Sequence, residues 1–130
     1  NLPEEFVKVF YRESSHPIYE VELLPLLIAV MLWSSYIDKA QFVCYLENDS
    51  ARSGFIKGSG ATRLADGIIQ LFCEAEAVLQ LKSWFSRVPS HSNISDGPSR
   101  LDFRLMLSVG CSRAVVPWKE IASKVSSRLT

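Results

Sequence analysis

Three acidic residues stand at positions where carboxylates can gather around a cation. Glu22 opens an apolar helical run, Glu47 ends a short apolar strand, and Asp96 lies in a polar loop after a second strand. Hard cations such as Mg²⁺ prefer carboxylate oxygens, and a two-metal site needs these oxygens to converge from several elements. The set predicts metal ligands at Glu22, Glu47 and Asp96, although Asp96 taken alone is typical of an ordinary helix cap.

The elements that would carry these acids follow from the spacing of apolar residues. Alternation predicts strands at residues 6–12, 42–46 and 81–88, and apolar stripes predict helices at 22–33, 51–56, 62–78 and from Pro117 onward. Asn48 or Asp49 can cap the helix over 51–56, and Gly58 can end it. Trp84 and Phe85 would point to opposite faces, so helices are expected to cover both sides of an α/β sheet.

Within the polar stretch of residues 87–100, Asp96 lies at the start of a predicted helix. Proline is tolerated in a first helical turn, so Gly97-Pro98-Ser99 can open a helix that Ser95 or Asp96 caps. His91 lies in the same stretch and is typical of a solvated loop histidine. The stretch therefore predicts a strand end, a loop and a short helix with one acid at its start.

Four segments, in order along the chain, resemble a known family. They are Val21-Glu22-Leu23-Leu24; residues 45–52 (YLENDSAR) with Lys57-Gly58; Trp84-Phe85; and RVPS at 87–90 through DGPSR at 96–100. On these motifs, which span most of residues 6–103, the chain resembles the RNase H-like domain of reverse-transcriptase retroelements, especially the tyrosine-recombinase retrotransposon type. The resemblance implies an RNase H-like mixed sheet flanked by helices, and two-metal hydrolysis of the RNA strand of an RNA/DNA hybrid.

The resemblance also assigns roles to individual residues. Glu22 matches the family's helix glutamate and Asp96 its last catalytic aspartate, so both would bind Mg²⁺. Glu47 stands where the family usually has aspartate, and its extra methylene displaces the carboxylate. Asp49 could take that role only if the strand continues that far. Some RNases H carry a histidine that assists product release near the position of His91.

The amino-terminal part departs from the family. Residues 6–12 fit the family's third strand, whereas its first two strands and its first metal-binding aspartate have no counterpart, and Glu4 and Glu5 are typical of a solvated end. The strand at 42–46 would then have an open edge, which another polypeptide is expected to cover. The chain is thus expected to be catalytically incomplete alone. The alternatives are a structural or accessory subunit of a larger assembly, and an unrelated α/β binding module.

Composition fits one domain with a helical tail. The 130 residues are 48% hydrophobic, which suffices for a core, and the formal net charge of zero gives no general attraction to phosphate. Residues 1–103 would form the RNase H-like domain, and residues 104–130 would pack on it or on a partner. A local basic groove could still use Arg52, Lys57, Arg63, Lys82, Arg87 and Arg100.

The cysteines and the apolar runs argue against a zinc-binding protein, a disulfide-rich protein and a membrane-spanning protein. The spacing of the three cysteines fits neither a zinc site nor a disulfide framework, so Cys44, Cys73 and Cys111 are expected to be small buried hydrophobic residues. A protein without disulfides is more typical of the cell interior. The apolar run from Val21 to Trp33 is too short to span a bilayer and contains Glu22 and Pro25, so no transmembrane segment is expected. No signal-peptide pattern is visible at the amino terminus.

Overall fold

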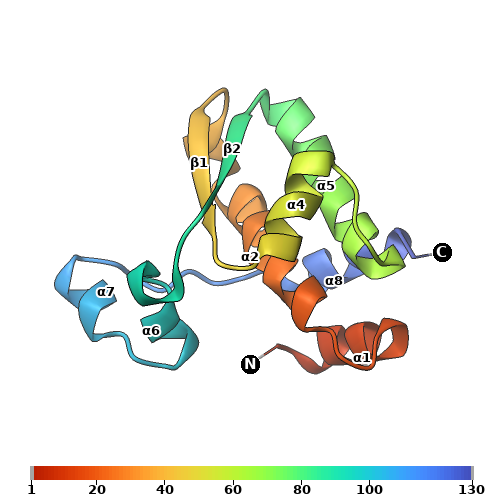
Figure 1. Cartoon of the computed structure of the whole chain (residues 1–130), viewed down its shortest axis with the longest axis horizontal. Coiled ribbons are helices and arrows are strands. Elements are labelled where there is room, and N and C mark those ends of the chain that lie inside the picture. Colours follow the sequence, from red (N-terminus) through yellow and green to blue (C-terminus); the bar gives the residue numbers. More distant parts are fainter. Residues whose placement is uncertain (1, 130) are drawn as a thin grey trace.

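The computed structural model describes residues 2–129 as a mostly helical α/β fold with one two-stranded parallel sheet (Figure 1). The coarse α/β prediction is therefore confirmed. In chain order the elements are α1 (Glu4–Glu13), α2 (Ile18–Leu32), α3 (Ser34–Ile37), β1 (Gln41–Leu46), α4 (Asp49–Lys57), α5 (Arg63–Leu79), β2 (Lys82–Arg87), a 3₁₀ turn (Ser90–Ser92), α6 (Asp96–Ser99), α7 (Arg104–Ser108) and α8 (Trp118–Ser127).

The core is built where α2 packs along α5. Nearly every side of α2 is apolar, which suits a helix surrounded by other elements. Leu23 and Val30 of α2 and Ile68 and Phe72 of α5 are at most 1% exposed. Figure 1 shows α4 beside these two helices and the sheet at one end of them. This core fixes the position of α2, whose second turn contains Glu22.

The two strands run parallel because α4 and α5 carry the chain back between them. Cys44 of β1 is buried, and Phe85 of β2 packs against Phe55 at 5.4 Å and Phe72 at 5.9 Å between ring centroids. These contacts hold the inner face of the sheet on α4 and α5. Both strands therefore end on the same side, which brings Glu47 near the loop that follows β2.

Local signals set the ends of α4 and α5 as expected. The Asn48 side chain accepts a hydrogen bond of 2.8 Å from the Ala51 N–H and caps α4, so Asp49 is the first helical residue. Gly58 ends α4 with a φ of 74°, a conformation that glycine adopts without strain. Thr62 caps α5 and donates to Glu20, a carboxylate that is only 2% exposed.

The prediction of a strand at residues 6–12 is wrong, because α1 occupies this segment. Its apolar residues also fit helical spacing: Phe6 and Phe10 are one turn apart and both fully buried. Their rings pack at 5.7 Å, and Phe6 meets Trp118 of α8 at 5.5 Å. Burial of this aromatic pair outweighs the alternation that suggested a strand.

The expectation that helices cover both faces of the sheet is also wrong. Val43, Tyr45 and Trp84 are 51%, 68% and 71% exposed, and Val43 lies directly opposite Trp84 across the sheet. We call Val43, Tyr45 and Trp84 the open face. A parallel sheet is normally buried on both sides, so this apolar face is unusual. The ring contacts of Phe55 and Phe72 with Phe85 lie on the inner face, which leaves the other face exposed.

The carboxyl-terminal segment closes the same core. Ile121 and Val125 of α8 are fully buried, α8 contacts α1 and α5, and Arg128 forms an ion pair with Glu74 of α5. Between β2 and α8, the segment that holds α6 and α7 projects from this core (Figure 1). The tail thus divides into a projecting part and a docked helix.

The three cysteines differ in their surroundings, which corrects the expectation that all are buried. Cys44 is buried, Cys73 is half-buried and Cys111 is exposed, and all three are free thiols. Cys111 lies in the projecting segment, which has little core to enter. No helix within residues 2–129 combines the length and apolar character needed to cross a bilayer.

Candidate functional site

One cavity brings the three predicted acidic residues together. Its volume is about 600 Å³, and Glu22 of α2, Glu47 at the end of β1 and Asp96 at the start of α6 all line it. The remaining lining residues are Val21, Pro25, Asn48, Asn93, Ser95 and Ser99. Three separate elements therefore supply the acidic residues that line this cavity.

Glu22 reaches the cavity from the second turn of α2. Pro25 lies within this helix and lacks an N–H, so the carbonyl of Val21 loses its usual intrahelical donor. Val21 and Pro25 both line the cavity beside Glu22. This wall of the cavity therefore combines the Glu22 carboxylate with a helical turn that lacks one backbone hydrogen bond.

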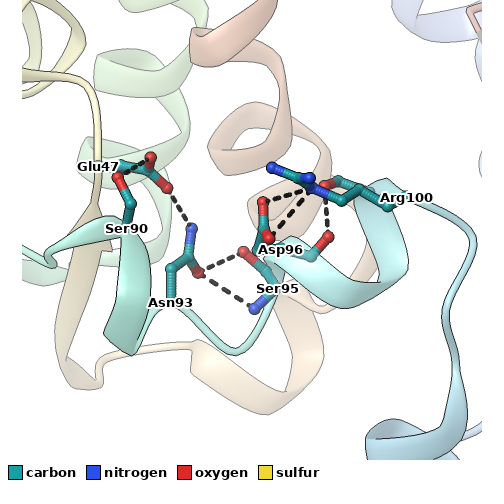
Figure 2. A network of polar contacts seen from close by, with 7 residues as sticks. Glu47, Ser90, Asn93, Ser95, Asp96 and Arg100 are labelled. Atoms are coloured by element: carbon teal, nitrogen blue, oxygen red, sulfur yellow. Dashed lines mark hydrogen bonds and ion pairs between the residues drawn. The ribbon is translucent and has the colours of Figure 1, made fainter.

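Glu47 is held in place by the loop that follows β2. The Ser90 hydroxyl donates to Oε1 of Glu47 at 2.5 Å, and Nδ2 of Asn93 donates to Oε2 at 2.9 Å (Figure 2). These two hydrogen bonds stabilise the charged form and lower the pKa of the Glu47 carboxyl, with a smaller contribution from the charges of Arg100 and Arg87. Glu47 is therefore an ionised carboxylate with a defined orientation at neutral pH.

Asp96 is the first residue of the short helix α6. Its Oδ2 lies 3.2 Å from Nε of Arg100, one helical turn later (Figure 2). Ser95 does not cap the helix, which corrects the expected cap: its hydroxyl donates to Oδ1 of Asn93 at 2.6 Å instead. Asn93 also accepts from the Ser95 backbone N–H at 3.1 Å, so its side chain holds the residue that precedes α6.

The acids share a cavity without forming a compact cluster. Among residues 2–129, no three His, Cys, Asp or Glu side chains lie close enough together to hold a metal ion. Hydrogen bonds occupy Glu47, and an ion pair occupies Asp96. The donors are all carboxylate oxygens, a set whose chemistry suits Mg²⁺. The arrangement therefore offers hard oxygen ligands, two of which are engaged by protein groups.

The structure separates Asp49 and His91 from this cavity. Asp49 lines a different hollow beside Tyr19 and Lys57 and lies 3.4 Å from Arg87, so Glu47 is the strand-end acid that faces the candidate site. His91 is exposed on the 3₁₀ turn. Its exposure agrees with the interpretation as a solvated loop histidine.

The basic residues considered for a local groove come from several elements, among them α4, α5 and β2. Four of them are engaged on different elements: Arg52 donates to the carbonyl of Phe85, Arg63 pairs with Glu13, Arg87 with Asp49, and Arg100 with Asp96. Three of these contacts offset a positive charge with a carboxylate. The guanidinium groups of Arg63, Arg87 and Arg100 are therefore partly neutralised within the chain.

Sequence reasoning missed the residues that hold the acids. Ser90 and Asn93 are polar loop residues, and their partner Glu47 lies 43 and 46 positions away, so no local pattern could reveal the contacts. The pairing of Asp96 with Arg100 was accessible in principle, because acidic and basic residues four apart face each other on a helix. Comparison of the chain with protein-family profiles, with curated proteins and with solved structures gave no match.

Proposed function

We propose that this chain is an RNase H-like domain of retroelement origin, whose Glu22, Glu47 and Asp96 form part of a Mg²⁺-dependent site for hydrolysis of the RNA strand of an RNA/DNA hybrid. The observation that carries the proposal is the shared cavity, which three carboxylates line from three elements. The motifs that resemble the family supply the substrate class. The proposal includes that the chain alone is catalytically incomplete.

The donor set supports a magnesium site. Glu22, Glu47 and Asp96 would bind the cation, which supplies an activated water and charge stabilisation for phosphodiester hydrolysis. Glu47 is already ionised and oriented by Ser90 and Asn93. Asp96 is balanced by the guanidinium of Arg100, a charge that a bound cation would replace. Contacts with Ser90, Asn93 and Arg100 thus hold two of the three carboxylates before any cation binds.

Incompleteness follows from the number and arrangement of the acids. A two-metal site needs bridging ligands that match ions about 4 Å apart, and the described residues do not gather three acidic side chains that tightly. The resemblance implies a further aspartate on a strand with no counterpart here. A second polypeptide that pairs with β1 would end beside Glu47, because β1 runs into the cavity at its carboxyl end.

The first experiment tests the site through metal binding. Mn²⁺ added to isotopically labelled protein should broaden the amide signals around Glu22, Glu47 and Asp96, and Asp96→Asn should abolish that local broadening. Asp102→Asn is the matched control, because Asp102 is an acid of the same segment that does not line this cavity. Broadening that persists unchanged in Asp96→Asn would contradict the site.

The second experiment tests incompleteness. Purified residues 1–130 with Mg²⁺ and an RNA/DNA hybrid should show no cleavage above the Asp96→Asn variant, because removal of a ligand carboxylate from a working metal site weakens and misplaces the ion. Asp96-dependent cleavage by the wild-type chain would overturn the claim of incompleteness. It would also establish the enzyme.

The sheet favours a second candidate function, that of a structural or accessory subunit. Within residues 2–129, β2 is the only strand beside β1, and the open face leaves Val43, Tyr45 and Trp84 in solvent. An unpaired edge next to exposed apolar side chains is a template for a strand from another chain. In this case assembly would depend on β1 and would be unaffected by substitution of Glu22, Glu47 or Asp96.

A further inference from the structure

The outer edge of β1 carries backbone groups that the described part of the chain leaves unpaired. The ladder with β2 uses alternate residues of β1, because the carbonyls of Ala40 and Leu46 accept from the β2 segment at either end. The backbone groups that point away from β2 belong to Gln41, Val43 and Tyr45. Within residues 2–129 no hydrogen bond reaches these groups from outside the sheet, and β1 lies at the margin of the molecule (Figure 1). The edge is therefore open to a further strand.

Nothing in β1 itself opposes pairing along this edge. Proline, charged residues and bulges protect the edges of natural sheets, and the β1 sequence QFVCYL contains no proline and no charge. Val43 and Tyr45 add apolar side chains that lie in solvent. The formal net charge of the chain is zero, so two copies experience no overall repulsion. A second copy of this chain can therefore approach the β1 edge.

β1 is complementary to itself in one antiparallel register. A two-fold axis at Val43 places this residue opposite its own copy, and Gln41 opposite Tyr45 of the second copy. All three residues have outward backbone groups, so each of the three pairs can exchange two hydrogen bonds. Registers centred on Phe42 or Cys44 would pair only two of the three residues. A slip of one residue would place the exposed Val43 opposite the buried Cys44, and would join the open face of one copy to the inner face of the other.

Opposite charges meet at both ends of the same register. Lys39 and Glu47 are exposed, and they lie four positions before and four positions after Val43. An antiparallel pair centred on Val43 therefore sets Lys39 of each copy opposite Glu47 of the other. Lys39 forms no ion pair within residues 2–129, and each Glu47 oxygen keeps a lone pair beside the one hydrogen bond that it accepts. Exposed ion pairs add little affinity, so these charges select the register while the backbone ladder supplies the binding.

From this self-complementarity we infer that the chain forms a two-fold dimer in which β1 pairs antiparallel with β1 of a second copy, with Val43 at the axis. The result is a four-stranded sheet in which the open faces of the two copies adjoin. The inference deepens the second candidate function, on whose open β1 edge it rests, and it needs no metal. β1 has six residues, whereas stable interfaces use about 20–30 residues a side, so the dimer is expected to dissociate on dilution.

Disulfide trapping in the full 130-residue chain tests the register. In a Cys111→Ser background, Val43→Cys should give a covalent dimer on oxidation with copper phenanthroline, because directly opposite residues have Cα atoms about 5.5 Å apart, within the reach of a disulfide. Tyr45→Cys is the matched control on the same exposed face. Its two copies would lie about 13 Å apart along the strands, so it should not form the covalent dimer. Adding Gln41→Cys to Tyr45→Cys should restore it.

Amide hydrogen exchange, followed as the protein concentration rises, tests the edge without a crosslink. The N–H groups of Val43 and Tyr45 should exchange fast in dilute solution and slowly at high concentration, where the second copy supplies their acceptors. Lys39→Glu should move this protection to several-fold higher concentration, because it sets two acidic side chains against each other at each end. Lys82→Glu is the matched control, since Lys82 is an exposed lysine of β2 and lies off the β1 edge.

The outcomes separate this inference from the candidate function on which it rests. Fast exchange of the Val43 and Tyr45 amides at every concentration, in a chain that stays monomeric, would overturn the dimer. The β1 edge would then still be open to a different polypeptide, so the accessory-subunit candidate would stand. Slow exchange already in dilute solution would show that the edge is closed within one copy, and would overturn both. Trapping of Tyr45→Cys as readily as Val43→Cys would contradict the register.

Discussion

Asp96 and Arg100 form an ion pair one helical turn apart, with 3.2 Å between Oδ2 and Nε. Asp96 faces the candidate cavity, so the guanidinium occupies a carboxylate that the proposed site needs. A cation entering the cavity must share this carboxylate with Arg100 or displace the side chain. The ion pair is therefore expected to oppose metal binding.

The first prediction is that Arg100→Gln strengthens Mn²⁺ binding by up to about fivefold, because an exposed ion pair contributes at most about 1 kcal/mol. Paramagnetic broadening of backbone amides measures the affinity. Arg104→Gln is the control, since Arg104 pairs with Asp102, which does not line the cavity. Weaker binding in Arg100→Gln would show that Arg100 supports the site.

The second prediction concerns pH and the contact between α1 and α5. Two hydrogen bonds from Arg63, of 2.6 and 3.1 Å, lower the pKa of Glu13 below its ordinary value of 4.5. A lowered pKa means that the contact stabilises the fold above about pH 4.5 and loses its effect as the pH falls through the lower folded value. Arg63 is largely exposed, so solvent screening is expected to keep this contribution small.

Urea unfolding of Arg63→Gln measures this contribution. The variant should be less stable than wild type at pH 7, and the difference should shrink as the pH drops below 4. Lys8→Gln is a control, since Lys8 pairs with the exposed Glu4 of the same helix. A difference that grows on acidification would contradict the assignment.

Local interactions were predictable from the sequence, and those between distant segments were not. Asn48 and Gly58 bound α4 as expected, because a side-chain cap and a left-handed glycine act within a few residues. The prediction for the segment of α1 was wrong, because Phe6 and Phe10 fit the spacing of either a strand or a helix. The burial of both rings and the contact of Phe6 with Trp118 exist only in the folded chain. The three acids were placed near one another, whereas the bridge through Asn93 required the folded loop.

The third prediction concerns thiol reactivity. Burial raises the pKa of Cys44 to about 12, whereas Cys111 is exposed. At pH 8 about one part in ten thousand of a thiol with that pKa is thiolate, the reactive form. An aromatic disulfide reagent should therefore label Cys111 first and Cys44 only on unfolding. Cys111→Ser should remove the fast phase, and Cys44→Ser should leave it intact; the reverse result would refute the burial of Cys44.

The fourth prediction tests the ring cluster that holds the sheet on the helices. Phe72 is 1% exposed and contacts the rings of Phe55 and Phe85. Phe72→Ala should lower the free energy of unfolding by about 3–5 kcal/mol, because it removes a large apolar side chain and leaves a cavity. Val78→Ala, on the same helix at 81% exposure, should change it by less than about 0.5 kcal/mol. Equal losses in urea unfolding would contradict this packing.

The last prediction concerns the outer edge of β1. Two hydrogen bonds, from Lys82 N–H to the Ala40 carbonyl at 2.9 Å and from Val88 N–H to the Leu46 carbonyl at 3.0 Å, fix the ladder with β2. In a parallel ladder alternate residues bond to the same neighbour, so the backbone groups of Val43 and Tyr45 point to the outer edge. Those groups can pair with a strand from another polypeptide.

Without that polypeptide, the isolated chain should associate reversibly as its concentration rises, which sedimentation velocity can measure. Val43→Lys should reduce this association, because a charge on an exposed strand opposes edge-to-edge pairing. Val78→Lys is the matched control, since Val78 is exposed on α5 and belongs to neither strand. A wild-type chain that stays monomeric at every concentration would contradict the prediction. Equal loss of association in Val43→Lys and Val78→Lys would show that added positive charge reduces association wherever it is placed, and that the β1 edge has no special role.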